Sequence, residues 1–119
     1  VHRYKPQMTD NIFRVSRVLN RAIRDKFGDD ENLCRKLQNM YKPEYVILLG
    51  FAIKNELLGP RSGCADKIRG ICLDPDNRAI IREFPVQYRE TFNRMIYFVM
   101  RHPARVLCNL LHFVQTIHG

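Results

Sequence analysis

Four arginines near the start of the chain are spaced in a way that suits anion binding. They are separated by three, four and three residues, and they are Arg14, Arg17, Arg21 and Arg24. On a helix this spacing places all four side chains within an arc of about 80°. Arginine binds carboxylate and phosphate groups bidentately, and such a partner would offset the mutual repulsion of four like charges. The row therefore predicts a docking face for an acidic protein segment, with nucleic-acid backbone as the alternative.

The positive charge is distributed unevenly along the chain. The 119 residues carry 20 Lys and Arg against 12 Asp and Glu, which gives a formal net charge of +8. Residues 1–28 have a net charge of +5 and residues 91–119 a net charge of +3, so the middle of the chain is neutral overall. A competing interpretation is that the arginine row forms ion pairs within the fold, with Asp29, Asp30 and Glu31 as the nearest acidic cluster.

A second, weaker group of cations lies in the glycine-bearing segment 59–70. It consists of Arg61, Lys67 and Arg69. A glycine-containing loop that leads into a helix can bind an anion through its backbone N–H groups. The spacing matches neither a Walker loop nor a dinucleotide fingerprint. We therefore expect these residues to support the first basic group, with an ordinary surface loop as the alternative.

The third feature is a run of six apolar residues, 95–100, which covers every face of a helix. One side of this helix must meet the core, and the inward stripe is complete without Tyr97, Phe98 and Met100. These three side chains are predicted to remain exposed and to support self-association into a homodimer. The alternative is burial against a neighbouring helix of the same fold.

No arrangement typical of catalysis or metal binding occurs in the sequence. Cys108 and His112 share a helix face, and His118 lies near the same side, but the four cysteines lack the spacing of a zinc site. The only serines are Ser16 and Ser62, and neither has the context of a nucleophile. The acidic residues cluster at turns and helix starts, where capping explains them. We expect no enzyme activity, no cofactor and no metal site.

The elements that position these residues are predicted to be helices. Residues 1–9 form an extended lead-in, and Thr9 or Asp10 caps a first helix that ends at Gly28. Its apolar stripe is Ile12, Val15, Leu19, Ala22, Ile23 and Phe27. A second helix begins in the acidic cluster 29–31 and stops at Lys42-Pro43, where Pro43 starts a third. Residues 45–53 are apolar all round, so this third helix is expected to be the most buried.

Further helices are expected over 62–73, 76–83, 86–101 and from Pro103 to the end. The last one is expected to bury its apolar residues, which are Val106, Leu107, Leu110, Phe113, Val114 and Ile117. The sequence thus predicts an all-α, compact single domain over 10–119 with six or seven short helices. These helices would form an irregular bundle or stacked helical hairpins.

Composition excludes several classes of protein. Apolar residues make up 45% and charged residues 27%, which are globular values. No apolar run approaches the roughly 18–20 residues of a membrane span, the first residues lack a signal-peptide pattern, and four cysteines do not make a disulfide scaffold. We expect an intracellular protein, nuclear or cytoplasmic, that acts as a regulatory adaptor by binding an acidic partner protein.

Overall fold

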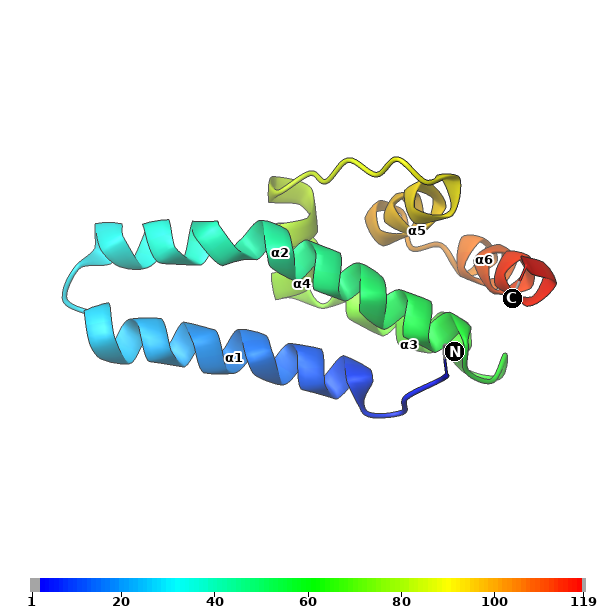
Figure 1. Cartoon of the computed structure of the whole chain (residues 1–119), viewed down its shortest axis with the longest axis horizontal. Helices are drawn as coiled ribbons and strands as arrows, with labels where there is room; N and C mark the ends of the chain where they lie inside the picture. The colour runs from blue at the N-terminus through cyan, green and yellow to red at the C-terminus, as the bar shows by residue number, and fades with distance from the viewer. Residues whose placement is uncertain (1–2, 119) are drawn as a thin grey trace.

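Six helices follow one another in the computed structural model, which describes residues 3–118 (Figure 1). Within these residues there is no strand, so the expected all-α class is confirmed. The helices are α1 (Met8–Phe27), α2 (Glu31–Leu57), α3 (Cys64–Leu73), α4 (Pro75–Glu83), α5 (Thr91–Arg101) and α6 (Arg105–His118).

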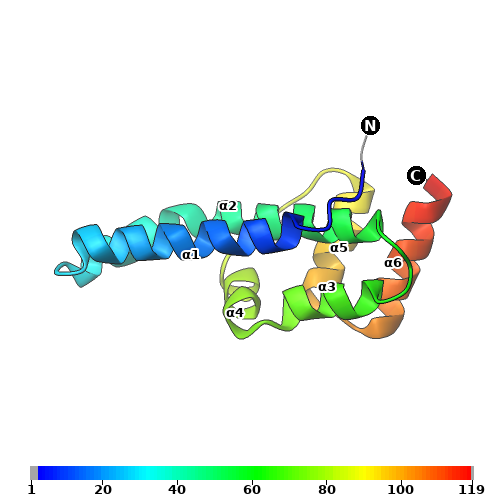
Figure 2. The same cartoon turned by 90° about the horizontal axis from the view of Figure 1, so that it is seen from below.

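The helices form an irregular bundle around α2. Helices α1 and α2 make a long antiparallel hairpin, whose tip extends beyond the other four helices (Figure 2). Helix α2 contacts each of the other five helices. Helix α6 lies at the end of the molecule opposite the hairpin tip (Figure 2), and the long dimension of the molecule is 51 Å. The two ends of this elongated shape therefore present different helices to solvent.

The expectation that Pro43 ends one helix and begins another is wrong, because α2 runs through it. Proline lacks an N–H, so the carbonyl of Asn39 loses its intrahelical partner. Asn39 is exposed, which leaves its carbonyl open to water. The predicted acidic start is confirmed: Asp30 caps α2, and its side chain accepts a hydrogen bond of 3.0 Å from the N–H of Leu33.

The core is one apolar cluster centred on the second half of α2. Val46, Leu49 and Ile53 are completely buried there, as the sequence predicts. Every helix contributes to the cluster. The other helices supply Ile12 from α1; Ile68, Ile71 and Cys72 from α3; Ile81 from α4; Ile96, Val99 and Met100 from α5; Cys108 and Leu111 from α6. Burial of this apolar surface drives the association of the six helices.

The connection between α4 and α5 is longer than expected. Residues 84–90 are not helical, and α5 begins at Thr91 instead of near 86. This segment spans from the end of α4 to the start of α5 (Figure 1). It is fastened by the N–H of Val86, which donates to the Tyr97 hydroxyl, and by Arg94 Nε, which donates to the Tyr88 carbonyl at 2.7 Å. These contacts replace the hydrogen bonds that a helix would have made.

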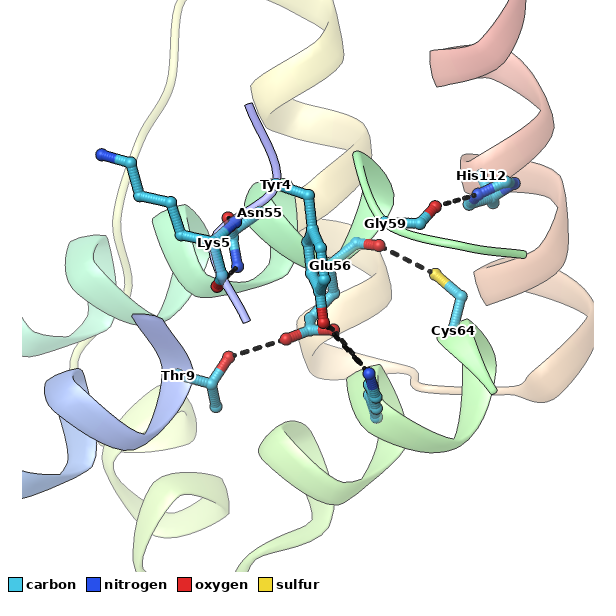
Figure 3. A network of polar contacts seen from close by, with 9 residues as sticks. Tyr4, Lys5, Thr9, Asn55, Glu56, Gly59, Cys64 and His112 are labelled. Atoms are coloured by element: carbon cyan, nitrogen blue, oxygen red, sulfur yellow. Dashed lines mark hydrogen bonds and ion pairs between the residues drawn. The ribbon is translucent and has the colours of Figure 1, made fainter. Parts of the chain in front are cut away.

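The start of α1 also differs from the prediction. The helix begins at Met8, and neither Thr9 nor Asp10 caps it, because the N-cap position is Gln7 without a side-chain hydrogen bond. Thr9 Oγ1 instead donates to Glu56 Oε1 on α2 at 3.0 Å (Figure 3). A tertiary hydrogen bond has therefore replaced the local cap.

Candidate functional site

Helix α1 packs on α2 with a different face from the one predicted. Its inward side includes Ile12, Ser16 and Asn20, and Asn20 Oδ1 accepts a hydrogen bond from the Tyr41 hydroxyl. Relative to the predicted stripe the helix is turned by about 50°. Val15 and Leu19, which were expected inside, are therefore 46% and 40% exposed.

The four predicted arginines all lie on the exposed side of α1. The ion pairs among the described residues are Lys67 with Glu56 and Arg105 with Asp66, so none of the four arginines is paired. Intramolecular pairing, the competing interpretation of the row, is therefore not observed in residues 3–118. Asp30, one of the acids considered as a partner, instead caps α2.

The four side chains do not form one uniform patch. Arg14, Arg17 and Arg21 surround Val18 and a shallow concavity of about 390 Å³ on the outer side of α1, and Asp25 also lines this concavity. Val18 is 58% exposed. We call the outer surface formed by Arg14, Arg17, Arg21, Val15, Val18, Leu19 and Ala22 the α1 face. Cations and aliphatic side chains therefore lie next to one another on this helix.

Arg24 lies on the other side of the row. With Arg17 it borders a cleft of about 450 Å³ between α1, α2 and α4. The charged residues that line this cleft are three cations and three acids, namely Arg17, Arg24, Lys42, Asp74, Asp76 and Glu83. These charges balance when Arg17 is included, so the remaining excess positive charge of the row lies with Arg14 and Arg21, beside Asp25, on the outer side of α1.

The second basic group is not assembled into an anion site. Lys67 Nζ lies 3.8 Å from Glu56 and donates to the Tyr4 hydroxyl at 3.1 Å, and this hydrogen bond, more than Glu56, raises the pKa of Lys67. Arg69 Nε donates to the Pro103 carbonyl at 3.1 Å, which ties α3 to the α5–α6 connection. Arg61 is exposed. Two of the three predicted binding residues are thus engaged in intramolecular contacts.

The end of α2 holds a buried polar network that the sequence analysis did not find (Figure 3). Glu56 is 4% exposed and receives the hydrogen bonds from Thr9 and Tyr4. The Asn55 side chain exchanges two hydrogen bonds of 2.8 Å with the backbone of Lys5. The signal in the sequence is the polar run Lys54, Asn55 and Glu56 inside an otherwise apolar stretch. This network anchors the lead-in and α1 to α2.

The cysteines lie in the buried interior, and His112 contacts a backbone carbonyl. Within the described residues no group of three His, Cys, Asp or Glu side chains could hold a metal ion. His112 Nε2 lies 3.3 Å from the Gly59 carbonyl, and the side chain of His118 lies outside the described residues. All four cysteines are free and buried. Burial raises the pKa of Cys64 to about 11 and that of Cys72 to about 12.

The predicted exposed residues of α5 behave differently from one another. Phe98 is 54% exposed, as expected. Tyr97 is half-buried against Tyr88, with ring centroids 5.8 Å apart. The expectation that Met100 is exposed is wrong, because its side chain belongs to the core. The helix turns Met100 with Ile96 and Val99 toward α2, and Phe98 lies on the opposite side.

Helix α6 also departs from the predicted pattern. Val106, Leu110, Phe113 and Ile117 were expected inside, and all four are exposed. The helix instead packs Cys108 and Leu111 against the core. None of the helices in the described region has the length and hydropathy to cross a membrane.

Comparisons with known proteins add no further residues to these surfaces. No protein-family model, no curated protein sequence and no solved structure matches this chain.

Proposed function

We propose that this chain is a non-enzymatic helical interaction domain that docks an acidic segment of a partner protein on the α1 face. The observation that carries the proposal is the row of Arg14, Arg17 and Arg21, which are exposed and lack ion pairs within the described residues. Uncompensated arginines on one helix repel one another. A partner with carboxylates removes that repulsion and gains bidentate hydrogen bonds.

The aliphatic side chains of the α1 face favour a protein over a nucleic acid. Val18 is 58% exposed beside the arginines, and Val15 and Leu19, which are 46% and 40% exposed, continue the apolar surface around the helix. An amphipathic helix with an acidic edge can cover these side chains while its carboxylates reach the guanidinium groups. A phosphate backbone would contact the arginines but leave the apolar row in water, and no aromatic side chain is exposed there for base stacking.

The buried polar groups serve the fold. Among the described residues, every buried side-chain nitrogen and oxygen atom has a hydrogen-bond partner. The buried Glu56 is engaged by Thr9, Tyr4 and Lys67, which gives it a structural role. We propose that the protein acts as a regulatory adaptor inside the cell, in the nucleus or the cytoplasm.

The proposal is tested with a fluorescent peptide that is designed to form an amphipathic helix with glutamates along one edge and leucines on its apolar face. We expect saturable binding that weakens with salt, measured by fluorescence anisotropy. Labelled duplex DNA and single-stranded RNA are titrated in parallel. Tighter binding to either nucleic acid, with a log–log salt slope of about 0.7–0.9 per phosphate contact, would overturn the choice of partner.

Two charge-reversal variants provide the matched comparison. Arg14→Glu with Arg21→Glu alters the α1 face, and Arg78→Glu with Arg82→Glu alters two exposed arginines of α4. Both double variants lower the formal net charge from +8 to +4, because each replacement removes two units. Loss of peptide binding only in the α1 variant supports the proposal. Equal loss in both variants indicates that net charge alone is responsible and contradicts a defined docking face.

A further inference from the structure

The outer side of α6 carries an uncovered apolar stripe. It consists of Val106, Leu110, Phe113 and Ile117, which are between 52% and 76% exposed. At 100° per residue these four side chains lie within an arc of about 60°, on the side opposite the buried Cys108 and Leu111. Helix α6 lies at the end of the molecule, and none of the other helices in residues 3–118 covers the stripe (Figure 2).

The stripe continues into a groove between α5 and α6. This groove has a volume of about 340 Å³, and its exposed walls are almost entirely apolar. Phe98 and Leu110 both line it, so the exposed residue of α5 and the α6 stripe form one surface. We call Phe98, Val106, Leu110, Phe113 and Ile117 the α6 face.

The spacing of the stripe is symmetric when read in either direction. The intervals from Val106 to Ile117 are four, three and four residues, which is the spacing of core positions in a coiled coil. An antiparallel copy of the same helix places Val106 opposite the second copy's Ile117, and Leu110 opposite the second copy's Phe113. A twofold interface requires a surface that is complementary to itself in this way.

The charges at α6 also favour a second copy in antiparallel orientation. Residues 106–117 contain no Asp, Glu, Lys or Arg, so the stripe offers nothing to a charged partner. The cations beside it are Arg94, which lines the groove, Arg101 at the end of α5, and Arg105, which is already paired with Asp66 at 2.6 Å. Parallel pairing would bring these cations together. Antiparallel pairing separates Arg105 of the two copies by about 20 Å along the helix axis and places each one near the negative end of the other helix dipole.

The exposed area is large enough for a small dimer interface. Phe98 and Phe113 leave about 200 Å² uncovered at 54% and 61% exposure, since a phenylalanine carries about 150–250 Å². The three aliphatic side chains add a similar area, so two copies cover about 800 Å² with these five residues alone. Flanking residues bring the total to the roughly 1,000 Å² at which specific interfaces begin.

We propose that the α6 face pairs with the same face of a second copy, with the two α6 helices antiparallel. The homodimer has one twofold axis, which passes between Leu110 and Phe113. The α1 face is not part of this contact, so the dimer presents two α1 faces for partner binding.

The first test is analytical ultracentrifugation of the full chain over about 1–300 µM, a range that spans the affinity expected of a small interface. We expect a monomer–dimer equilibrium for the wild type. Leu110→Asp with Phe113→Asp should weaken dimerisation by about 100-fold or more, because both replacements lie at the centre of the contact. Met40→Asp is the control, since Met40 is 74% exposed on α2 and outside both faces. A monomeric wild type, or a dimer that both variants retain, would overturn the proposal.

The second test does not depend on disruptive substitutions. Val106→Cys and Ile117→Cys variants are oxidised separately and as a mixture, and the native cysteines do not interfere because all four are buried. Antiparallel pairing predicts disulfide-linked dimers mainly in the mixture, since like positions are about 16 Å apart along the helix axis. Strong cross-linking of either variant alone, or of neither the variants nor their mixture, would contradict the antiparallel dimer.

Discussion

The α1 face and the α6 face are both exposed helix surfaces with uncovered apolar side chains, but they differ in charge. The α1 face sets Val15, Val18 and Leu19 beside three arginines. The α6 stripe contains only apolar side chains and is continuous with an apolar groove. A basic and apolar surface selects a partner of opposite charge, whereas an uncharged surface with symmetric spacing is suited to a copy of itself.

In both helices, side chains from elsewhere in the fold decide which face points inward. Helix α1 turns Asn20 toward α2 because Tyr41 donates a hydrogen bond to it. Helix α6 turns Cys108 and Leu111 inward, while Arg105 is held by Asp66 of α3. In each case an apolar stripe that the sequence pattern predicts to be buried is left in solvent. The most informative variants therefore compare the inner and outer side of the same helix.

The largest expected effect separates the two sides of α6. Leu111→Ala removes a completely buried side chain and should lower the free energy of unfolding by about 2–5 kcal/mol. Leu110→Ala alters a side chain that is 52% exposed. This substitution should change the free energy of unfolding by no more than about 0.5 kcal/mol. Urea denaturation at low protein concentration, where the chain is monomeric, measures both. Equal losses would mean that α6 is oriented differently.

The next effect concerns the anchor of α1. Glu56→Ala leaves the hydroxyls of Thr9 and Tyr4 without their acceptor and should lower the free energy of unfolding by about 2 kcal/mol. Lys67→Ala should have a much smaller effect, because Lys67 is exposed and its ion pair with Glu56 is 3.8 Å long. Thermal denaturation of the two variants checks this order. A more damaging Lys67 substitution would show that the ion pair, and not the hydroxyl contacts, holds the network.

A smaller effect distinguishes the two groups of basic residues. Arg69→Ala loses the hydrogen bond to the Pro103 carbonyl and should destabilise the fold by about 1 kcal/mol. Arg14→Glu with Arg21→Glu should change stability by no more than a few tenths of a kcal/mol, because the arginine repulsion that is removed is offset by new repulsion from Asp10 and Asp25, each four residues away on α1. Thermal denaturation monitored by circular dichroism compares them. Unfolding of the α1 variant would assign a structural role to the row.

The smallest expected effect near neutral pH concerns the buried thiols of Cys72 and Cys108. Burial raises the pKa of Cys108, and it raises that of Cys72 from 9.0 to about 12. An unfolded thiol ionises near pH 9, so the stability from these neutral thiols is complete below that pH and decreases as the pH rises toward 12. At pH 8 we expect slow labelling of both by a thiol reagent. Rapid labelling of Cys108 in the native protein would mean that the Cys108 side of α6 is not inward.

The sequence predicts well those features that local chemistry determines. The start of α3 after Gly63, the cap at Asp30 and the burial of Val46, Leu49 and Ile53 all follow from nearby residues. At Gly63 the backbone has φ = 78°, a conformation that glycine adopts without strain. Local rules failed at Pro43, where α2 continues without a break. Burial of residues on both sides of the proline outweighs the one hydrogen bond that it removes.

The orientation of α1 and α6 could not be predicted from local pattern. Each helix has apolar residues on more than one side, so periodicity alone does not say which side meets α2 or α3. The contacts that accompany these orientations come from Tyr41 and Asp66, which lie 21 residues or more from their partners, and from burial of Cys108 and Leu111 in the core. The sequence thus located the arginine row correctly, but the aliphatic residues beside it and the exposed α6 stripe required the tertiary structure.

The most direct measurement of the central claim, that the α1 face binds an acidic partner, is a charge-swap titration by fluorescence anisotropy. The acidic amphipathic peptide and a version with lysine in place of glutamate are each titrated with the wild type and with Arg14→Glu/Arg21→Glu. We predict that the wild type binds only the acidic peptide and that the variant binds the lysine peptide in preference. Binding of the acidic peptide with equal affinity by both proteins would contradict the claim.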